Sequence, residues 1–207
     1  MEPRNPWKQL PLAVYEGHMK LDTVAQLQAL DLLYAERLAA YPSGSVGIWG
    51  IAGGNGLRHI DPGRCGAVYG VDVNEDYLSA CRVRFPKLAG KLTLIHADLS
   101  QPAELPYAEL VFADLFIEYI GIPSFIAQVE ACKPRILCCT IQQNLTEAFV
   151  SPSPYADALL DIGSLHTDVE EGALMKSLDP IGYALLYRSE VPLVNGKQFV
   201  RLDFTAR

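Results

Sequence analysis

Three aspartates stand at the ends of short apolar runs in this chain. Asp72 lies in YGVDVN, Asp98 in IHADLS and Asp114 in FADLF. Each run has the composition of a buried strand, and ligands of parallel sheets bind at the carboxyl ends of the strands. One carboxylate there can accept hydrogen bonds from both ribose hydroxyls, and another can accept one from the amino group of adenine. The three acids together predict a nucleoside site.

A glycine-rich stretch precedes these acids. VGIWGIAGGNGL (46–57) contains Gly47, Gly50, Gly53, Gly54 and Gly56. Glycine costs backbone entropy, so the stretch is either a structural turn or a place where the backbone must approach a ligand closely. A strict G-x-G-x-x-G is absent because Ala52 and His59 occupy required positions, which counts against a dinucleotide. The lack of G-x-x-x-x-G-K-[ST] excludes a P-loop.

The composition favours a globular protein of one domain. The chain has 207 residues, of which 50% are hydrophobic and 20% are charged. No apolar run reaches roughly 18 residues, so we expect no membrane span. The N-terminal MEPRNPWKQLPL also lacks a long apolar stretch and a cleavage-like site. We therefore expect a cytoplasmic protein.

Charge, cysteine content and histidine spacing count against a nucleic-acid partner, a disulfide framework and a metal site. The net charge is −7 and no Lys/Arg cluster is present, so nucleic acid is an unlikely partner. The five cysteines are odd in number and form no C-x-x-C pair, which is typical of reduced cytosolic thiols. The four histidines lack metal-ligand spacing, and we predict no metal site.

Short apolar runs alternate with helical patterns along the chain. Strands are predicted at 46–51, 67–73, 92–98, 108–114 and 135–142. Helices are predicted at 21–41, 75–85, 123–133 and 167–178, with a further helix from about Leu57. This order predicts an α/β fold.

Local signals refine the predicted fold. Asn74 can cap the helix that follows it, and Thr167 with Glu170 forms a capping box. Asn195-Gly196 between 183–194 and 197–207 predicts an antiparallel hairpin. We therefore expect a doubly wound, mostly parallel seven-stranded sheet with a C-terminal antiparallel hairpin and helices on both faces.

In their order and spacing, these motifs resemble those of the class I S-adenosylmethionine-dependent methyltransferases. WGIAGGNG (49–56) matches the glycine loop of that family. VYGVDVNEDYLSACR places Asp72 at the ribose position, and LTLIHADL places Asp98 at the adenine position. AELVFADLFIEYI places Asp114 toward the methyl-transfer site. The resemblance covers about residues 24 to 207 and implies S-adenosylmethionine as cofactor and S-adenosylhomocysteine as product.

The resemblance also implies a set of cofactor-binding residues and a division of the chain. Those residues are Gly50, Ala52, Gly53, Gly54, Gly56, Asp72, Val73, Ala97, Asp98, Leu99 and Asp114. Residues 1–40 would form an N-terminal lid segment and helix, and residues 41–207 the methyltransferase domain. The chain departs from the family at Gly50, where an acidic residue usually supports the methionine amino group.

Candidate acceptor residues come from two segments. Glu118 and Tyr119 follow the fourth predicted strand, where a substrate would lie. PLAVYEGHMKL carries Tyr15 and His18, which suit a lid over the acceptor, with His18 as a possible base; a packing arm is the alternative. The fourth-strand motif is DLFI rather than [DN]PP[YF], and with the acidic charge it favours a small-molecule acceptor.

Two other functions stay open from the sequence. The first is an NAD-type dinucleotide-binding oxidoreductase, against which the broken G-x-G-x-x-G and the terminal hairpin count. The second is a non-catalytic nucleoside-binding module, which the missing acid at Gly50 leaves open. The oligomeric state cannot be inferred from these patterns.

Overall fold

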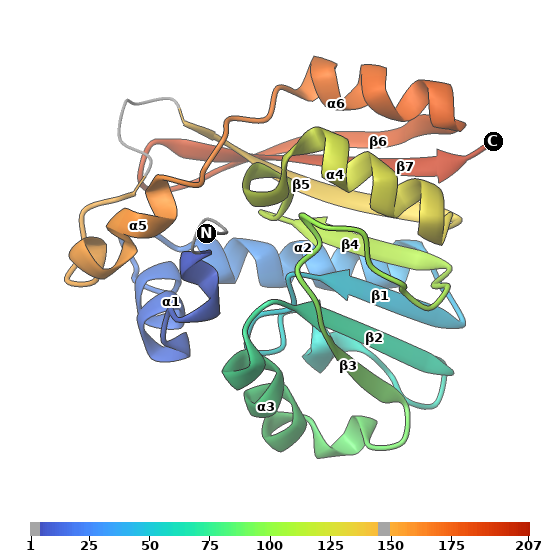
Figure 1. Cartoon of the computed structure of the whole chain (residues 1–207), viewed down its shortest axis with the longest axis horizontal. Helices are drawn as coiled ribbons and strands as arrows, with labels where there is room; N and C mark the ends of the chain where they lie inside the picture. The colour runs from blue at the N-terminus through green and yellow to red at the C-terminus, as the bar shows by residue number, and fades with distance from the viewer. Residues whose placement is uncertain (1–4, 145–149) are drawn as a thin grey trace.

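Seven strands form one mixed sheet in the computed structural model, which describes residues 5–144 and 150–207 (Figure 1). The strands are β1 (Ser45–Trp49), β2 (Ala67–Asp72), β3 (Leu92–His96), β4 (Leu110–Asp114), β5 (Ile136–Asn144), β6 (Tyr183–Pro192) and β7 (Lys197–Ala206). Their order is β3-β2-β1-β4-β5-β7-β6. Only β7 runs antiparallel to its neighbours, β5 and β6. The predicted mostly parallel sheet with a terminal hairpin is confirmed.

Helices cover both faces of the sheet, as expected. They are α1 (Leu12–Met19), α2 (Gln26–Ala40), α3 (Glu75–Arg84), α4 (Ile117–Cys132), α5 (Leu160–Gly163) and α6 (Glu171–Leu178). Side chains of β4 alternate between two cores: Leu110 and Phe112 pack with α2 and α3, whereas Val111 and Ala113 pack with α4 and α6. In Figure 1, α4 and α6 lie in front of the sheet and α2 lies behind it.

The connection from β1 to β2 differs from the prediction. The helix expected from Leu57 is a single 3-10 turn, Leu57–His59. The chain turns at Asp61, whose side chain accepts from the Gly63 N–H (2.8 Å) and whose carbonyl accepts from Cys65 (3.0 Å). Pro62 in this turn has no N–H to continue a helix. The prediction of a full helix here was wrong.

Two further helices also differ from the prediction. The helix expected at 21–41 begins at Gln26, because Ala25 adopts a left-handed φ of 54°. The helix expected at 123–133 begins at Ile117 and kinks at Gly121, where φ is 76°. At both places a residue with positive φ interrupts the helical backbone, which the local sequence pattern did not reveal.

One predicted helix cap forms and the other does not. Asn74 caps α3 as predicted, accepting from the Asp76 N–H at 3.1 Å. The predicted capping box at Thr167 was wrong. The backbone N–H of Thr167 donates to the Glu118 carbonyl (2.9 Å), and α6 begins only at Glu171. None of the helices in the described residues has the length and apolar character needed to cross a membrane.

Candidate functional site

One pocket lies at the carboxyl ends of the first four strands. The predicted cofactor residues that line it are Gly50, Ala52, Asp72, Val73, Ala97, Asp98, Leu99 and Asp114. The four predicted acceptor residues, Tyr15, His18, Glu118 and Tyr119, line the same pocket. The topology explains this gathering, because β3, β2, β1 and β4 are parallel neighbours and their ends meet at one edge.

The rest of the glycine turn is packed against side chains. Gly53, Gly54 and Gly56 are not among the residues that line the pocket. A β-carbon at Gly54 would meet Phe85, and one at Gly56 would meet Tyr34. Both glycines also have positive φ, of +110° and +77°, which other residues rarely adopt. Packing alone therefore gives a reason for these glycines, and their role in cofactor binding stays a prediction.

Asp72 is held at the end of β2 by the backbone. Its Oδ2 accepts from the Ala52 N–H and its Oδ1 from the Asn74 N–H, both at 2.9 Å. Burial raises the pKa of Asp72 to about 6, although these hydrogen bonds oppose the increase. Each oxygen keeps a second lone pair, so the carboxylate can still accept from a ligand's hydroxyls.

Asp98 is bonded by its own turn and by the N-terminal segment. Its Oδ1 accepts from the Ser100 hydroxyl (2.6 Å), and its Oδ2 accepts from the Asn5 amide (3.2 Å). Lys8 Nζ lies 3.6 Å from the same Oδ2. Burial raises the pKa of Asp98, but the hydrogen bonds and Lys8 outweigh it and lower the pKa below its usual value. This carboxylate is therefore a charged acceptor.

Asp114 belongs to a buried ion cluster. Arg37 Nη1 donates to Asp114 Oδ1 (2.7 Å), Arg37 Nε to Asp203 Oδ1 (2.9 Å) and Arg37 Nη2 to the Cys139 carbonyl (2.8 Å). Arg37 is completely buried. Burial lowers the pKa of Arg37, but the two aspartates outweigh it and raise the pKa, so the guanidinium stays protonated. The cluster joins α2, β4, β5 and β7.

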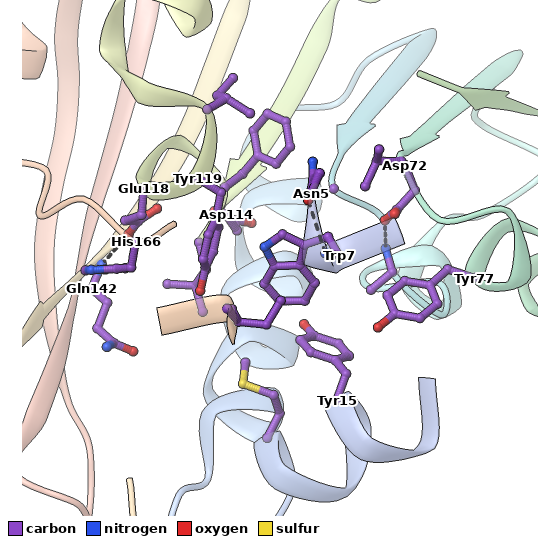
Figure 2. A pocket seen from close by; sticks show the side chains of 18 of the residues that line it. Asn5, Trp7, Tyr15, Asp72, Tyr77, Asp114, Glu118, Tyr119, Gln142 and His166 are labelled. Carbon is purple, nitrogen blue, oxygen red and sulfur yellow. Dashed lines mark hydrogen bonds between the residues drawn. The ribbon is translucent and has the colours of Figure 1, made fainter. Parts of the chain in front are cut away.

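The N-terminal segment forms one wall of the pocket (Figure 2). Trp7 lies between Tyr15 and Tyr119, with ring centroids 6.0 and 4.9 Å away in edge-on contacts. The Asn74 amide donates to the carbonyls of Trp7 (2.8 Å) and Leu10 (3.1 Å). The segment is thus fastened to the residues that follow β2.

Glu118 is a buried carboxyl group on the side of the pocket opposite Asp72 (Figure 2). Its Oε1 accepts from the backbone N–H of Gln142 at 2.9 Å. Burial raises its pKa to about 7, against the effect of backbone hydrogen bonds and with a further contribution from the charge of Asp114. A carboxyl group near half ionisation at neutral pH can accept or donate a proton.

His18 is a second group that can exchange a proton. Its Nδ1 lies 2.8 Å from the Ser153 hydroxyl. Burial, and then the charge of Lys197, lower the pKa of His18, which keeps the ring neutral at pH 7. Among the described residues, no three His, Cys, Asp or Glu side chains gather as metal ligands do.

Four buried polar atoms of the pocket have no hydrogen-bond partner among the described residues. They are Trp7 Nε1, Tyr77 Oη, Asp114 Oδ2 and Glu118 Oε2. Each such atom costs about 1–3 kcal/mol if nothing satisfies it. Two are donors and two are acceptors, so the pocket has the properties of a polar ligand's binding site.

Sequence reasoning missed several lining residues. Asn5 and Trp7 lie in a segment without periodicity, and no sequence signal marks them. Gln142 ends the strand predicted at 135–142 and lies two residues before the end of β5, so the strand-end rule could have found it. Tyr77 follows the Asn74 cap by one helical turn. His166 lies in the loop before α6 and also lines the pocket.

Comparison with solved structures places the fold in a known class. The chain has the fold of the class I S-adenosylmethionine-dependent methyltransferases. It is similar to magnesium protoporphyrin IX methyltransferase from Synechocystis PCC 6803 with bound S-adenosylmethionine (TM-score 0.71, 13% identity, 100% of both chains covered). It is also similar to N-methyltransferase NodS from Bradyrhizobium japonicum WM9 (0.69, 12%, 98% of this chain and 99% of that one).

The same fold also occurs in a protein described by another reaction, the [4+2]-cyclase SpnF (TM-score 0.62, 13% identity, 86% and 80% covered). No family model matches the chain, and a comparison with curated proteins gives no match. At these identities the likeness establishes the fold, and function must be argued from the site.

Proposed function

We propose that this protein is a methyltransferase that takes the methyl group of S-adenosylmethionine and transfers it to a small-molecule acceptor. The single observation that carries the proposal is the joint lining of one pocket by Asp72, Asp98 and Asp114, which lie at or just after the ends of β2, β3 and β4 at one edge of the same parallel sheet. Solved structures of the same fold hold S-adenosylmethionine or S-adenosylhomocysteine, which supports this choice of ligand.

The nucleoside half would be bound by two strand ends. Asp72 would accept from the ribose hydroxyls, because its backbone hydrogen bonds fix the carboxylate and leave lone pairs available. Asp98, one strand further along, would accept from the adenine amino group with the neighbouring Val73, Ala97 and Leu99 against the ring. The main chain at Gly50 and Ala52 would lie along the remaining part of the cofactor.

The acceptor half would be formed by Glu118, Tyr119, Tyr15 and His18. The cofactor supplies an electrophilic methyl group on a sulfonium, and the acceptor attacks it in line. The aromatic wall of Trp7, Tyr15 and Tyr119 would orient the acceptor and exclude water. Glu118 and neutral His18 are the two groups that could take the acceptor's proton.

Residues up to about 20 would act as the lid, whereas α2 packs into the core beneath the sheet and belongs to the main body. A cytoplasmic location is proposed from the sequence alone. We do not favour the oxidoreductase alternative, since the solved neighbours are methyltransferases or share their fold. A non-catalytic module would bind the same ligand without turnover.

Titration calorimetry tests the proposal directly. We expect S-adenosylmethionine and S-adenosylhomocysteine to bind one site with micromolar or tighter affinity, about −8 kcal/mol or below. NAD⁺ should give no heat of binding. Binding of NAD⁺ without S-adenosylhomocysteine would overturn the proposal in favour of the oxidoreductase. Binding without methyl transfer to any acceptor in a broad small-molecule panel would favour the non-catalytic module.

A further inference from the structure

The amino-acid tail of the proposed cofactor carries an ammonium group that needs an anionic partner once it is buried. We propose that Asp114, oriented by Arg37, is that partner and replaces an acidic residue in the glycine loop. This inference rests on the proposed function and deepens it. It makes Asp114 a binding residue and Arg37 a positioning residue.

The glycine loop cannot provide the anion at the position where the resemblance expects one. Gly50 has a φ of +71°, which side-chain-bearing residues rarely adopt. A β-carbon there would lie 2.7 Å from Phe116 Cδ2. An aspartate or glutamate at this position would therefore be strained and would collide with the aromatic ring.

Asp114 lies directly beside that position. In the parallel pairing of β1 with β4, Trp49 is the partner of Ala113. Gly50, which follows β1, and Asp114, which is the last residue of β4, therefore lie side by side, and both line the pocket. A carboxylate on β4 can reach the space that a side chain on the loop would have occupied.

The carboxylate of Asp114 is arranged to bind a donor in the pocket. Its Oδ1 is taken by Arg37 at 2.7 Å. Its Oδ2 is buried and has no partner within hydrogen-bond geometry among the described residues; the Tyr34 hydroxyl interacts with this carboxyl group through its charge and, more weakly, through a side-chain hydrogen bond. The side chain is 1% exposed, so an ammonium group that reached Oδ2 would meet a carboxylate that water does not screen.

The other acids of the pocket are assigned to the nucleoside half of the ligand or lie in another part of the pocket. Both oxygens of Asp72 accept from backbone N–H groups. Asp98 is bonded to Ser100 and Asn5. Glu118 lies on the far side of the pocket from Asp72 in Figure 2, toward Gln142 and His166. Asp114 remains as the charged acceptor between the two halves.

Arg37 fixes the direction of this carboxylate. Its three hydrogen bonds, to Asp114, Asp203 and the Cys139 carbonyl, leave the guanidinium one orientation. Arg37 does not line the pocket, so it can influence a ligand only through Asp114. Asp203 holds the other side of the guanidinium and is likewise absent from the lining residues.

Two ligands distinguish the contribution of the amino-acid tail to binding from that of the nucleoside. S-Adenosylhomocysteine carries the amino-acid tail, and 5′-methylthioadenosine has the same nucleoside and sulfur without it. For Asp114→Asn we expect affinity for S-adenosylhomocysteine to fall roughly 10- to 100-fold, as for a lost charged hydrogen bond. Affinity for 5′-methylthioadenosine should stay within about twofold. Arg37→Met should shift the ratio of the two affinities in the same direction.

Asp203→Asn is the matched control. It removes a charge from the same buried cluster, but its side chain keeps an oxygen that can accept from Arg37 and does not line the pocket, so the ratio should shift far less than in Asp114→Asn, even if the melting temperature falls. Equal losses for both ligands in Asp114→Asn, or no loss for either, would overturn the inference. So would a ratio shift in Asp203→Asn as large as that in Asp114→Asn.

One measurement needs no variant. An analogue of S-adenosylhomocysteine with hydrogen in place of the α-amino group should bind the native protein at least about tenfold more weakly than the parent. Equal affinity would overturn the inference while leaving the proposed function intact. A native protein that binds neither S-adenosylhomocysteine nor 5′-methylthioadenosine would overturn the proposed function, and this inference with it.

Discussion

The side chain of Asp72 gives the first test of the nucleoside site. Removing its carboxylate in Asp72→Ala should weaken S-adenosylhomocysteine binding at least about tenfold, because hydrogen bonds to a charged acceptor contribute roughly 1.5–3 kcal/mol each. Calorimetry on the folded variant measures this. Asp72→Asn, which keeps the size of the side chain, separates loss of charge from loss of packing. Unchanged affinity in both variants would contradict the ribose assignment.

Glu118 makes stability depend on pH. Burial raises its pKa from the usual 4.5 to about 7, so the folded protein holds this proton more tightly than the unfolded chain does. The ionised group therefore opposes folding, by an amount that is zero below about pH 4.5, grows to about pH 7 and is constant above. Glu118→Gln stays neutral, so its melting temperature should exceed the native value increasingly over that range.

Thermal denaturation between pH 4 and pH 8 measures this difference, at about 2–4 °C for each kcal/mol. Exposed Glu104 provides the matched control, since Glu104→Gln makes the same chemical change outside the buried core and should give a much smaller pH-dependent difference. A Glu118→Gln difference that is flat across the range, or that shrinks as pH rises, would show that the carboxyl group is not held protonated by burial.

The glycine turn after β1 is where packing and ligand binding can be told apart. Gly54→Val should unfold part of the protein, because Gly54 has a φ of +110° and a side chain would meet Phe85. If the turn also approaches the cofactor, the fraction that remains folded should bind S-adenosylmethionine far more weakly. Calorimetry corrected for the folded fraction decides between a packing role and a cofactor-binding role. Normal affinity for S-adenosylmethionine in the folded fraction would leave packing as the only role of Gly54.

Ala52 in the same turn offers a change in the opposite direction. Its φ of 49° is left-handed, which costs a residue with a β-carbon roughly 1 kcal/mol. Ala52→Gly should therefore preserve or raise the melting temperature, by up to a few degrees, and preserve or tighten binding of S-adenosylmethionine. A clear loss of stability would mean that the Ala52 methyl group, which is buried, contributes more by packing than the strain costs.

Strands were easier to predict than the segments between them. Short apolar runs predicted the strands, and the Asn195-Gly196 dipeptide predicted the hairpin, because both signals are local. The single turn after β1 and the kink at Gly121 depend on backbone angles that one sequence does not reveal. The strand-end rule brought Asp72, Asp98 and Asp114 to one pocket. It could not find Asn5 or Trp7, which reach the pocket through long-range contacts with Asp98 and Asn74.

The N-terminal segment connects distant parts of the molecule across the pocket. Asn5 bonds Asp98 after β3, and Trp7 packs on Tyr119 of α4. Removing residues 1–20 should abolish methyl transfer but change affinity for S-adenosylhomocysteine little, because the aspartates expected to hold the cofactor belong to the sheet edge. Trp7→Ala should also lower turnover, by less than the truncation does. Normal turnover by the truncated protein would contradict a lid over the acceptor.

The buried cluster of Arg37, Asp114 and Asp203 has a consequence for how the chain is made. Arg37 emerges from the ribosome early, in α2, whereas Asp203 lies in β7, which follows every other strand in synthesis. Because β7 inserts between β5 and β6, the sheet cannot reach its final order until that strand emerges. Until then the Arg37 guanidinium lacks one of its two carboxylates. In a nascent chain the guanidinium would therefore be held by fewer partners, and the carboxylate of Asp114 would gain its fixed direction only when the last strand of the sheet is in place.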